Sequence, residues 1–363
     1  MRRCLNCINF VGLNDNSIHQ ILKMKFRILA GVALSVSLTL LSGCNSDQPG
    51  ADSHQKADIV LEDTLTMLNQ AIVNQPAAVA PYLERANFFI KKDSLNLALK
   101  DVNSALEIEE NNPETYAVLS DVYLYSGKVQ RALDALKKAQ ELNASNAQFD
   151  VKMARIYLTM SDYKQTFESL RKALKKNPEN VEALFISGLA NEEMGDTAKA
   201  IENYQMTVAR NQKHFDALKQ LGILFAIKKD RLAIDYLRNA FTVRPGSVEP
   251  LYILGMFYQE NNDPDKALNV YNEILLIRPD YKLAQYNKGY VYLIYKEDYP
   301  EAISAFTEAI QLDAAYADAY FNRGYAYELS GNKEKAREDY RKVLTMSVND
   351  EKAVTALNRL DQK

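Results

Sequence analysis

Tryptophan is absent from the 363-residue chain, and glycine, histidine and cysteine are scarce. The three cysteines are Cys4, Cys7 and Cys44, and no second cysteine pair or local histidine cluster accompanies them. The sequence therefore does not support a zinc site, and no metal or cofactor is expected. The chain has only 13 glycines, which favours a helical protein. Hydrophobic residues make up 47% of the sequence, enough for a large core.

The charge is nearly balanced, with a formal net charge of −3. Lysine and arginine are spread along the sequence and do not gather into one basic stretch. A nucleic-acid-binding protein would need a concentrated basic face, so nucleic acid is not an expected partner.

Catalytic motifs are also missing. The chain has no nucleophile elbow, phosphate-binding loop, zinc-protease motif or dinucleotide fingerprint. Neighbouring carboxylates such as Glu109 and Glu110 fit solvated helix surfaces or turns. We expect no catalytic residues, and the chain is not expected to be an enzyme.

The N-terminal region resembles a bacterial lipoprotein signal. Lys25 and Arg27 precede an apolar run over residues 28–41, which is shorter than the roughly 20 residues of a membrane-spanning helix. The run ends in Leu-Ser-Gly-Cys44, which resembles the lipobox. The resemblance implies a signal peptide over residues 24–43 and a lipid on Cys44. The alternative is an ordinary signal peptide with an incidental cysteine.

The segments around this signal complete the predicted N-terminal organisation. Residues 1–23 read as an upstream extension, with Met24 as the true start, and residues 44–57 read as a flexible tether. Removal of residues 1–43 takes away five basic residues and one acid, which leaves a net charge of −7. By resemblance to bacterial sorting rules, Asn45 implies the outer membrane, with the periplasmic face favoured over the cell surface.

A 34-residue pattern repeats along the rest of the chain. In most units a large residue is followed four positions later by a small one, and three positions after that by an aromatic one; unit three begins with Asp150, and unit four has Asn191 at the aromatic position. A second segment then carries an alanine in every unit except unit three. The small position reads Ala86, Ser120, Ala154, Gly188, Gly222, Gly255, Gly289 and Gly324; the alanine position reads Ala98, Ala132, Thr166, Ala200, Ala233, Ala267, Ala302 and Ala336.

This pattern resembles the tetratricopeptide repeat. The resemblance implies an all-α fold, a right-handed superhelical solenoid of about eight helix-turn-helix units over residues 79–349. Residues 58–78 are expected to form an N-terminal helix or half repeat. Residues 350–363 are expected to form a capping helix, with Ala353, Val354, Leu357 and Leu360 facing inward.

Turn chemistry supports the same boundaries. Gly127, Gly195 and Gly331 stand where a first helix needs a residue at positive φ to end. Pro264 and Pro300 stand in the first turn of a second helix. The unit that contains Ala233 is one residue short and the unit that contains Ala302 is one residue long, and we expect the turns to absorb both changes.

The resemblance also implies a partner-binding groove lined by first helices. The expected lining of the last three units combines aromatic and apolar side chains with two asparagines that could bond a peptide backbone. These residues are Tyr252, Met256, Tyr286, Asn287, Tyr290, Phe321, Asn322 and Tyr325. The alternative is that the aromatic rings only fill gaps between neighbouring helices. A carboxylate clamp is doubtful because Tyr286 and Tyr290 stand where that clamp has lysine and asparagine.

Taken together, these features predict a membrane-anchored scaffold or adaptor of the bacterial cell envelope that binds partner proteins in its groove. The alternative function is a glycan- or small-ligand-binding lipoprotein that works with an outer-membrane transporter. Sugar-binding platforms favour tryptophan, which this chain lacks, although 22 tyrosines could substitute.

Overall fold

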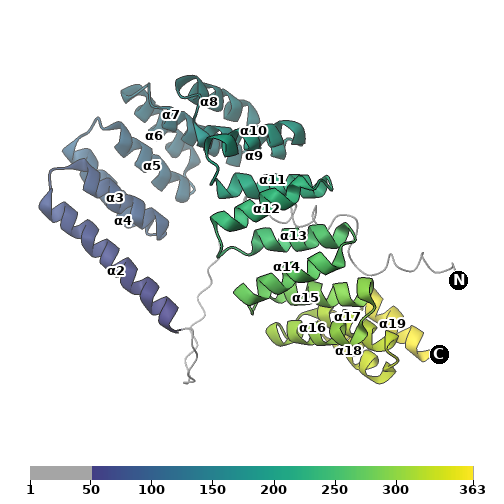
Figure 1. The fold of residues 1–363 in the computed structure, drawn as a ribbon. Coiled ribbons are helices and arrows are strands. Elements are labelled where there is room, and N and C mark those ends of the chain that lie inside the picture. The colour runs from purple at the N-terminus through teal and green to yellow at the C-terminus, as the bar shows by residue number, and fades with distance from the viewer. Residues whose placement is uncertain (1–50, 363) are drawn as a thin grey trace. The chain divides into compact units, whose positions relative to one another are not determined.

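The computed structural model describes residues 51–362, with side chains from residue 63 onward. The predicted upstream extension, the signal peptide and Cys44 lie outside this range. Throughout the described range the regular secondary structure is helical, which confirms the all-α prediction (Figure 1). Contacts divide the chain into an N-terminal unit, described here over residues 51–203, and a C-terminal unit over residues 204–362.

The N-terminal unit contains one long helix followed by helical hairpins. The first helix, α2, spans Ala51–Asn74. The helices that follow are α3 (Val79–Lys91), α4 (Leu95–Ile108), α5 (Pro113–Tyr125), α6 (Val129–Leu142), α7 (Ala147–Thr159), α8 (Tyr163–Lys176) and α9 (Val181–Glu193). Helix α10 (Thr197–Arg210) continues across the division between the two units.

The C-terminal unit repeats the hairpin arrangement. Its helices are α11 (Phe215–Ile227), α12 (Leu232–Val243), α13 (Glu249–Glu260), α14 (Pro264–Ile277), α15 (Lys282–Val291), α16 (Tyr299–Leu312), α17 (Ala317–Leu329), α18 (Lys333–Met346) and α19 (Glu351–Asp361). A short π-helix, η2 (Tyr292–Lys296), extends α15. From α3 to α18 the chain therefore forms helix pairs in the predicted 34-residue phase.

One backbone hydrogen bond recurs at the turn inside the hairpins. The N–H of Asp263, which precedes α14, donates to the carbonyl of Tyr258 at the aromatic position of α13. Gly127, Gly195 and Gly331 have φ values of 71°, 81° and 86°, as predicted. In other turns the same place is held by a non-glycine residue, namely Asp93, Ser161, Lys229, Asn262 and Glu297. The turn geometry is thus common to the repeats although its glycine is not.

The small residue of a first helix lies against a large residue of the second helix. A Cβ atom on Gly255 would lie 2.5 Å from the ring of Tyr271, which is fully buried. A Cβ atom on Gly289 would lie 2.8 Å from the ring of Phe306. These distances are too short for real contacts, so the small residue is what permits the close approach of the two helices.

The extra residue of the seventh repeat lies in a helix, which corrects the prediction that a turn absorbs it. The turn keeps its form, since Asp298 still caps the second helix and Glu297 has a φ of 52°. The N–H of Asp298 donates to the carbonyl of Tyr292, one residue farther back than in other repeats. A single π-turn can hold one additional residue without moving the turn beyond it.

The missing residue of the fifth repeat shortens the start of the second helix. Ala233 donates its N–H to the carbonyl of Asp230, three residues back. Ala267, its counterpart in the next repeat, donates to Asp263, four residues back. The first turn of α12 is therefore tighter, and the rest of the hairpin keeps its register.

The two ends of the array differ in detail from the predictions. Residues 51–57, predicted as part of the tether, belong to helix α2. This stretch contains no glycine or proline, the residues that most strongly oppose a helix. At the other end α19 buries Ala353, Ala356 and Leu360, but Val354 is 39% exposed and does not face inward as predicted.

None of the helices in the described part of the chain combines the length and the apolar character needed to span a bilayer.

Candidate partner-binding face

The predicted groove residues of the C-terminal unit lie on α13, α15 and α17. We call the surface formed by these three helices the first-helix face. Met256, Asn287 and Asn322 are buried, with exposed fractions of 7%, 7% and 3%. The remaining five residues are half-buried: Tyr252, Tyr286, Tyr290, Phe321 and Tyr325. The aromatic side chains therefore supply the accessible part of the predicted set.

The two asparagines connect neighbouring first helices. Asn287 Nδ2 donates to the hydroxyl of Tyr252 over 3.1 Å, and Asn322 Nδ2 donates to the hydroxyl of Tyr286 over 2.7 Å. The same pair thus recurs one repeat apart. The sequence predicts that both side-chain amides are free to bond a peptide backbone, but both amide nitrogens already donate hydrogen bonds within the chain. Asn322 Oδ1 is buried and has no hydrogen-bond partner among the described residues.

Three hydroxyl groups on this face, those of Tyr252, Tyr286 and Tyr290, stay protonated at physiological pH. Burial raises the pKa of Tyr252 and of Tyr290 to about 12. Burial also raises the pKa of Tyr286 well above its ordinary value. These three tyrosines therefore offer neutral rings and neutral hydroxyls, which suit apolar contact and hydrogen bonding rather than acid–base chemistry.

Two further tyrosines extend the aromatic surface, and sequence reasoning missed them. Tyr281 and Tyr316 immediately precede α15 and α17. The ring centre of Tyr281 lies 5.8 Å from that of Tyr252, and the ring centre of Tyr316 lies 5.0 Å from that of Tyr286. Their recurrence one repeat apart, just before a first helix, was the available signal.

First helices of the N-terminal unit carry charges that pair within the chain. Lys152 Nζ lies 2.5 Å from a carboxylate oxygen of Asp121, and Arg155 pairs with Glu182. Each pair joins two neighbouring repeats. These pairs bridge neighbouring repeats and leave less unpaired charge for a partner.

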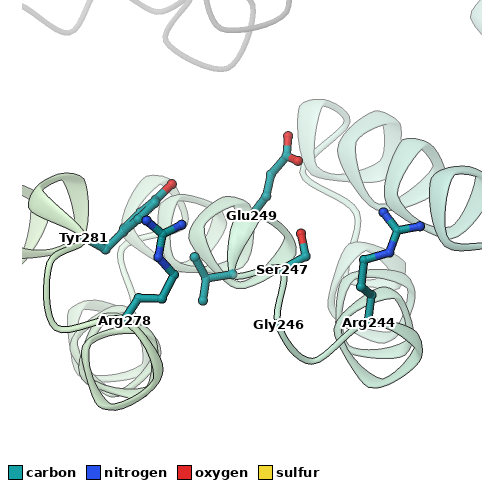
Figure 2. A pocket seen from close by; sticks show the side chains of 7 residues that line it. Arg244, Gly246, Ser247, Glu249, Arg278 and Tyr281 are labelled. Atoms are coloured by element: carbon teal, nitrogen blue, oxygen red, sulfur yellow. The ribbon is translucent and has the colours of Figure 1, made fainter. Parts of the chain in front are cut away.

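A shallow pocket lies between the ends of two second helices in the C-terminal unit (Figure 2). Its volume is about 620 Å³. Arg244 follows α12 and Arg278 follows α14, and the two side chains flank Ser247 and Glu249 at the start of α13 (Figure 2).

The charges around this pocket are largely compensated by neighbours. Glu249 lies 3.4 Å from Lys219, and Arg278 lies 3.6 Å from Asp280. The guanidinium carbon of Arg244 lies 3.9 Å from the ring centre of Phe215. The pocket is thus a polar junction between repeats without a concentrated charge.

The one histidine in the part of the chain with described side chains has a structural role. His214 precedes α11, and its Nδ1 accepts a hydrogen bond from the N–H of Ala217 over 3.2 Å. Among the described residues, no group of histidine, cysteine and acidic side chains is arranged to hold a metal ion.

Models of known protein families match several stretches of the chain. The family model of the cytochrome c-type biogenesis protein H TPR domain matches residues 91–214. Tetratricopeptide repeat models match residues 248–281, 293–331 and 317–350. No protein of curated function matches the chain.

Several solved structures resemble the chain. The C-terminal part of a TPR repeat-containing protein from Cytophaga hutchinsonii is 19% identical, with a TM-score of 0.48, over 76% of this chain and 99% of that one. A tetratricopeptide repeat protein from Parabacteroides merdae is 19% identical, with a TM-score of 0.46, over 69% and 99%. PilF of Pseudomonas aeruginosa is 17% identical, with a TM-score of 0.48, over 55% and 92%.

The repeat models match hairpins whose helices, turns and close glycine contacts follow one 34-residue plan. The chain is a tetratricopeptide repeat protein.

Proposed function

We propose that the chain is a lipid-anchored adaptor of the bacterial cell envelope that binds a segment of a partner protein on its first-helix face. Tetratricopeptide repeat proteins commonly present such a face to other proteins. The membrane anchor is the predicted lipid on Cys44. The outer membrane, periplasmic side, is the location that the sequence around Cys44 favours.

The observation that carries the proposal is the row of half-buried aromatic rings on successive first helices. Tyr286 and Tyr290 of α15 are followed by Phe321 and Tyr325 of α17. Rigid aromatic side chains lose little entropy on binding and are enriched among residues that dominate protein interfaces. The hydroxyls of Tyr286 and Tyr290 remain neutral, so a partner segment would meet apolar surface with hydrogen-bonding groups at its edge.

Binding should be lost selectively when this row is truncated. A Tyr290→Ala, Phe321→Ala double variant is expected to capture much less partner protein from envelope extracts than the parent chain. Tyr290→Phe is the matched control, because it keeps the ring and removes only the hydroxyl. Both variants must retain the parent's circular dichroism spectrum. Equal capture by the double variant would exclude this face as the binding site.

The glycan-binding alternative rests on the same tyrosines. It predicts measurable heat when oligosaccharides or cell-wall fragments are titrated into the protein, and loss of that heat in the double variant. The adaptor proposal predicts that the parent chain gives no such heat and still captures its partner protein.

A further inference from the structure

Among the helices that the structure describes, α2 is a second helix without a first helix of its own repeat beside it. Sequence phase places Met67 and Leu68 one 34-residue period before Asp101 and Val102 of α4. In the complete hairpins these two positions face the first helix of the same repeat. For example, Asp101 is hydrogen-bonded to Arg85 of α3, with 2.8 Å between Oδ2 and Nε.

Burial at these positions separates α2 from the complete repeats of the same unit. Met67 is 72% exposed, whereas its counterparts are almost fully covered: Asp101 at 2%, Ala135 at 7% and Ser169 at 5%. Leu68 is half-exposed, whereas its counterparts are buried: Val102 at 0%, Leu136 at 0% and Leu170 at 1%. The side of α2 that packs on α3 is occupied, since Asn69 accepts a hydrogen bond from Arg85 over 2.7 Å.

The exposed side of α2 also has an unusual composition for a water-facing helix. No charged residue occurs from Thr64 to Asn74. The corresponding helix α6 carries exposed charges at many positions, namely Arg131, Asp134, Lys137, Lys138 and Glu141. An uncharged strip with Met67 at its centre is typical of a surface that another helix covers.

The structure assigns this open side of α2 as a docking site for an amphipathic helix of a partner protein, which completes the half repeat in trans. The other hairpins of the chain show what such a helix must look like. Gly255 and Gly289 lie directly over Tyr271 and Phe306, which hold the position equivalent to Leu68. The partner helix therefore needs a small residue over Leu68, with large residues about one turn to either side.

The array itself provides a probe with this pattern. Residues 112–126, which form α5 with its Asn112 cap, carry Tyr116, Ser120 and Tyr123 in the required order. A fluorescent peptide of this sequence would be titrated with the full chain and its anisotropy recorded. We expect saturable binding, and at least about tenfold weaker binding of a peptide in which Ser120 is replaced by phenylalanine, because overpacking the crossing point prevents close approach.

Two variants of α2 supply a matched comparison. Met67→Glu places a charge on the open side of α2, and we expect it to weaken peptide binding at least about tenfold. Val73→Glu adds the same charge to the same helix at a residue that is 69% exposed. The counterparts of Val73 in complete repeats, Glu107 and Glu141, are exposed, so this variant should bind the peptide like the parent.

Three results would overturn the proposal. One is the absence of peptide binding at millimolar concentration, and another is an equal effect of the two glutamate variants. The third is a dimer in sedimentation velocity that Met67→Glu dissociates, since a second copy of this chain would then cover the open side of α2. This site lies on α2, whereas the proposed function is tested by variants on α15 and α17. A negative result for one site therefore does not bear on the other.

Discussion

The ion pair between Arg323 and Asp339 allows a quantitative test of how the last repeat is held together. Arg323 Nε and Nη2 donate to the two carboxylate oxygens of Asp339, each over 2.8 Å, and Nη1 donates to Thr307 over 3.0 Å. The side chains are 17% and 7% exposed. Hydrogen bonding to Asp339 raises the pKa of the Arg323 guanidinium above its ordinary value.

Three variants separate the energy of the pair from the cost of leaving one charge alone. Removing one partner of a buried pair costs about 3–5 kcal/mol, and partial exposure of Arg323 places Arg323→Met and Asp339→Leu near the lower value, about 3 kcal/mol. The double variant replaces both charges by apolar groups of similar size. We expect it to lie within about 1 kcal/mol of the parent, because no unpaired charge remains.

Hydrogen exchange of α17 and α18 in the full chain is the suitable assay, because repeat arrays can unfold in parts. Both single variants should increase the exchange of these helices, and the double variant should restore slow exchange. A double variant as unstable as the single ones would refute the reasoning. Arg85 and Asp101, seven periods earlier, form the same network with Asn69 and provide an internal replicate.

Three further outcomes follow from the repeat geometry. Gly255→Ala should lower the free energy of unfolding by about 1–3 kcal/mol in urea titrations, since its Cβ would overlap Tyr271, whereas Gly246→Ala, which has open space, should have little effect. Deletion of the exposed Lys296 should change the urea midpoint little, because the π-turn would revert to an α-turn; large destabilisation would contradict this. A hydrogen bond from Lys266 lowers the pKa of Asp263 in the folded state. The ionised Asp263 therefore stabilises the fold above about pH 4, and this stabilisation is lost on further acidification. Asp263→Asn should flatten this acid dependence of the urea midpoint.

Much of the fold could be predicted from the spacing of small and large residues. A glycine or alanine opposite a bulky side chain is required wherever two helices approach closely, so Gly255 and Gly289 marked the repeat reliably. The location of the extra residue in the seventh repeat could not be predicted. An α-helix can gain a residue as a π-turn or pass it to the following loop, and the sequence between Tyr292 and Asp298 permits both.

The binding face was harder to predict than the fold. A position on a first helix does not reveal whether its side chain meets solvent or a neighbouring repeat, because that depends on contacts between residues more than 30 positions apart. Asn287 and Asn322 illustrate this, since each hydrogen-bonds a tyrosine of the preceding repeat. The open side of α2 likewise depends on the folded contacts, since Met67 is exposed whereas the residues at equivalent positions of complete repeats are buried.

Photocrosslinking in cells tests the central claim most directly. A photoreactive residue at position 290 lies on the first-helix face, and one at the exposed Asn272 lies on a second helix. The adaptor account predicts a discrete protein adduct from position 290 that the Phe321→Ala substitution removes, and none from position 272. The same adduct from both positions, or no adduct from position 290, would contradict it.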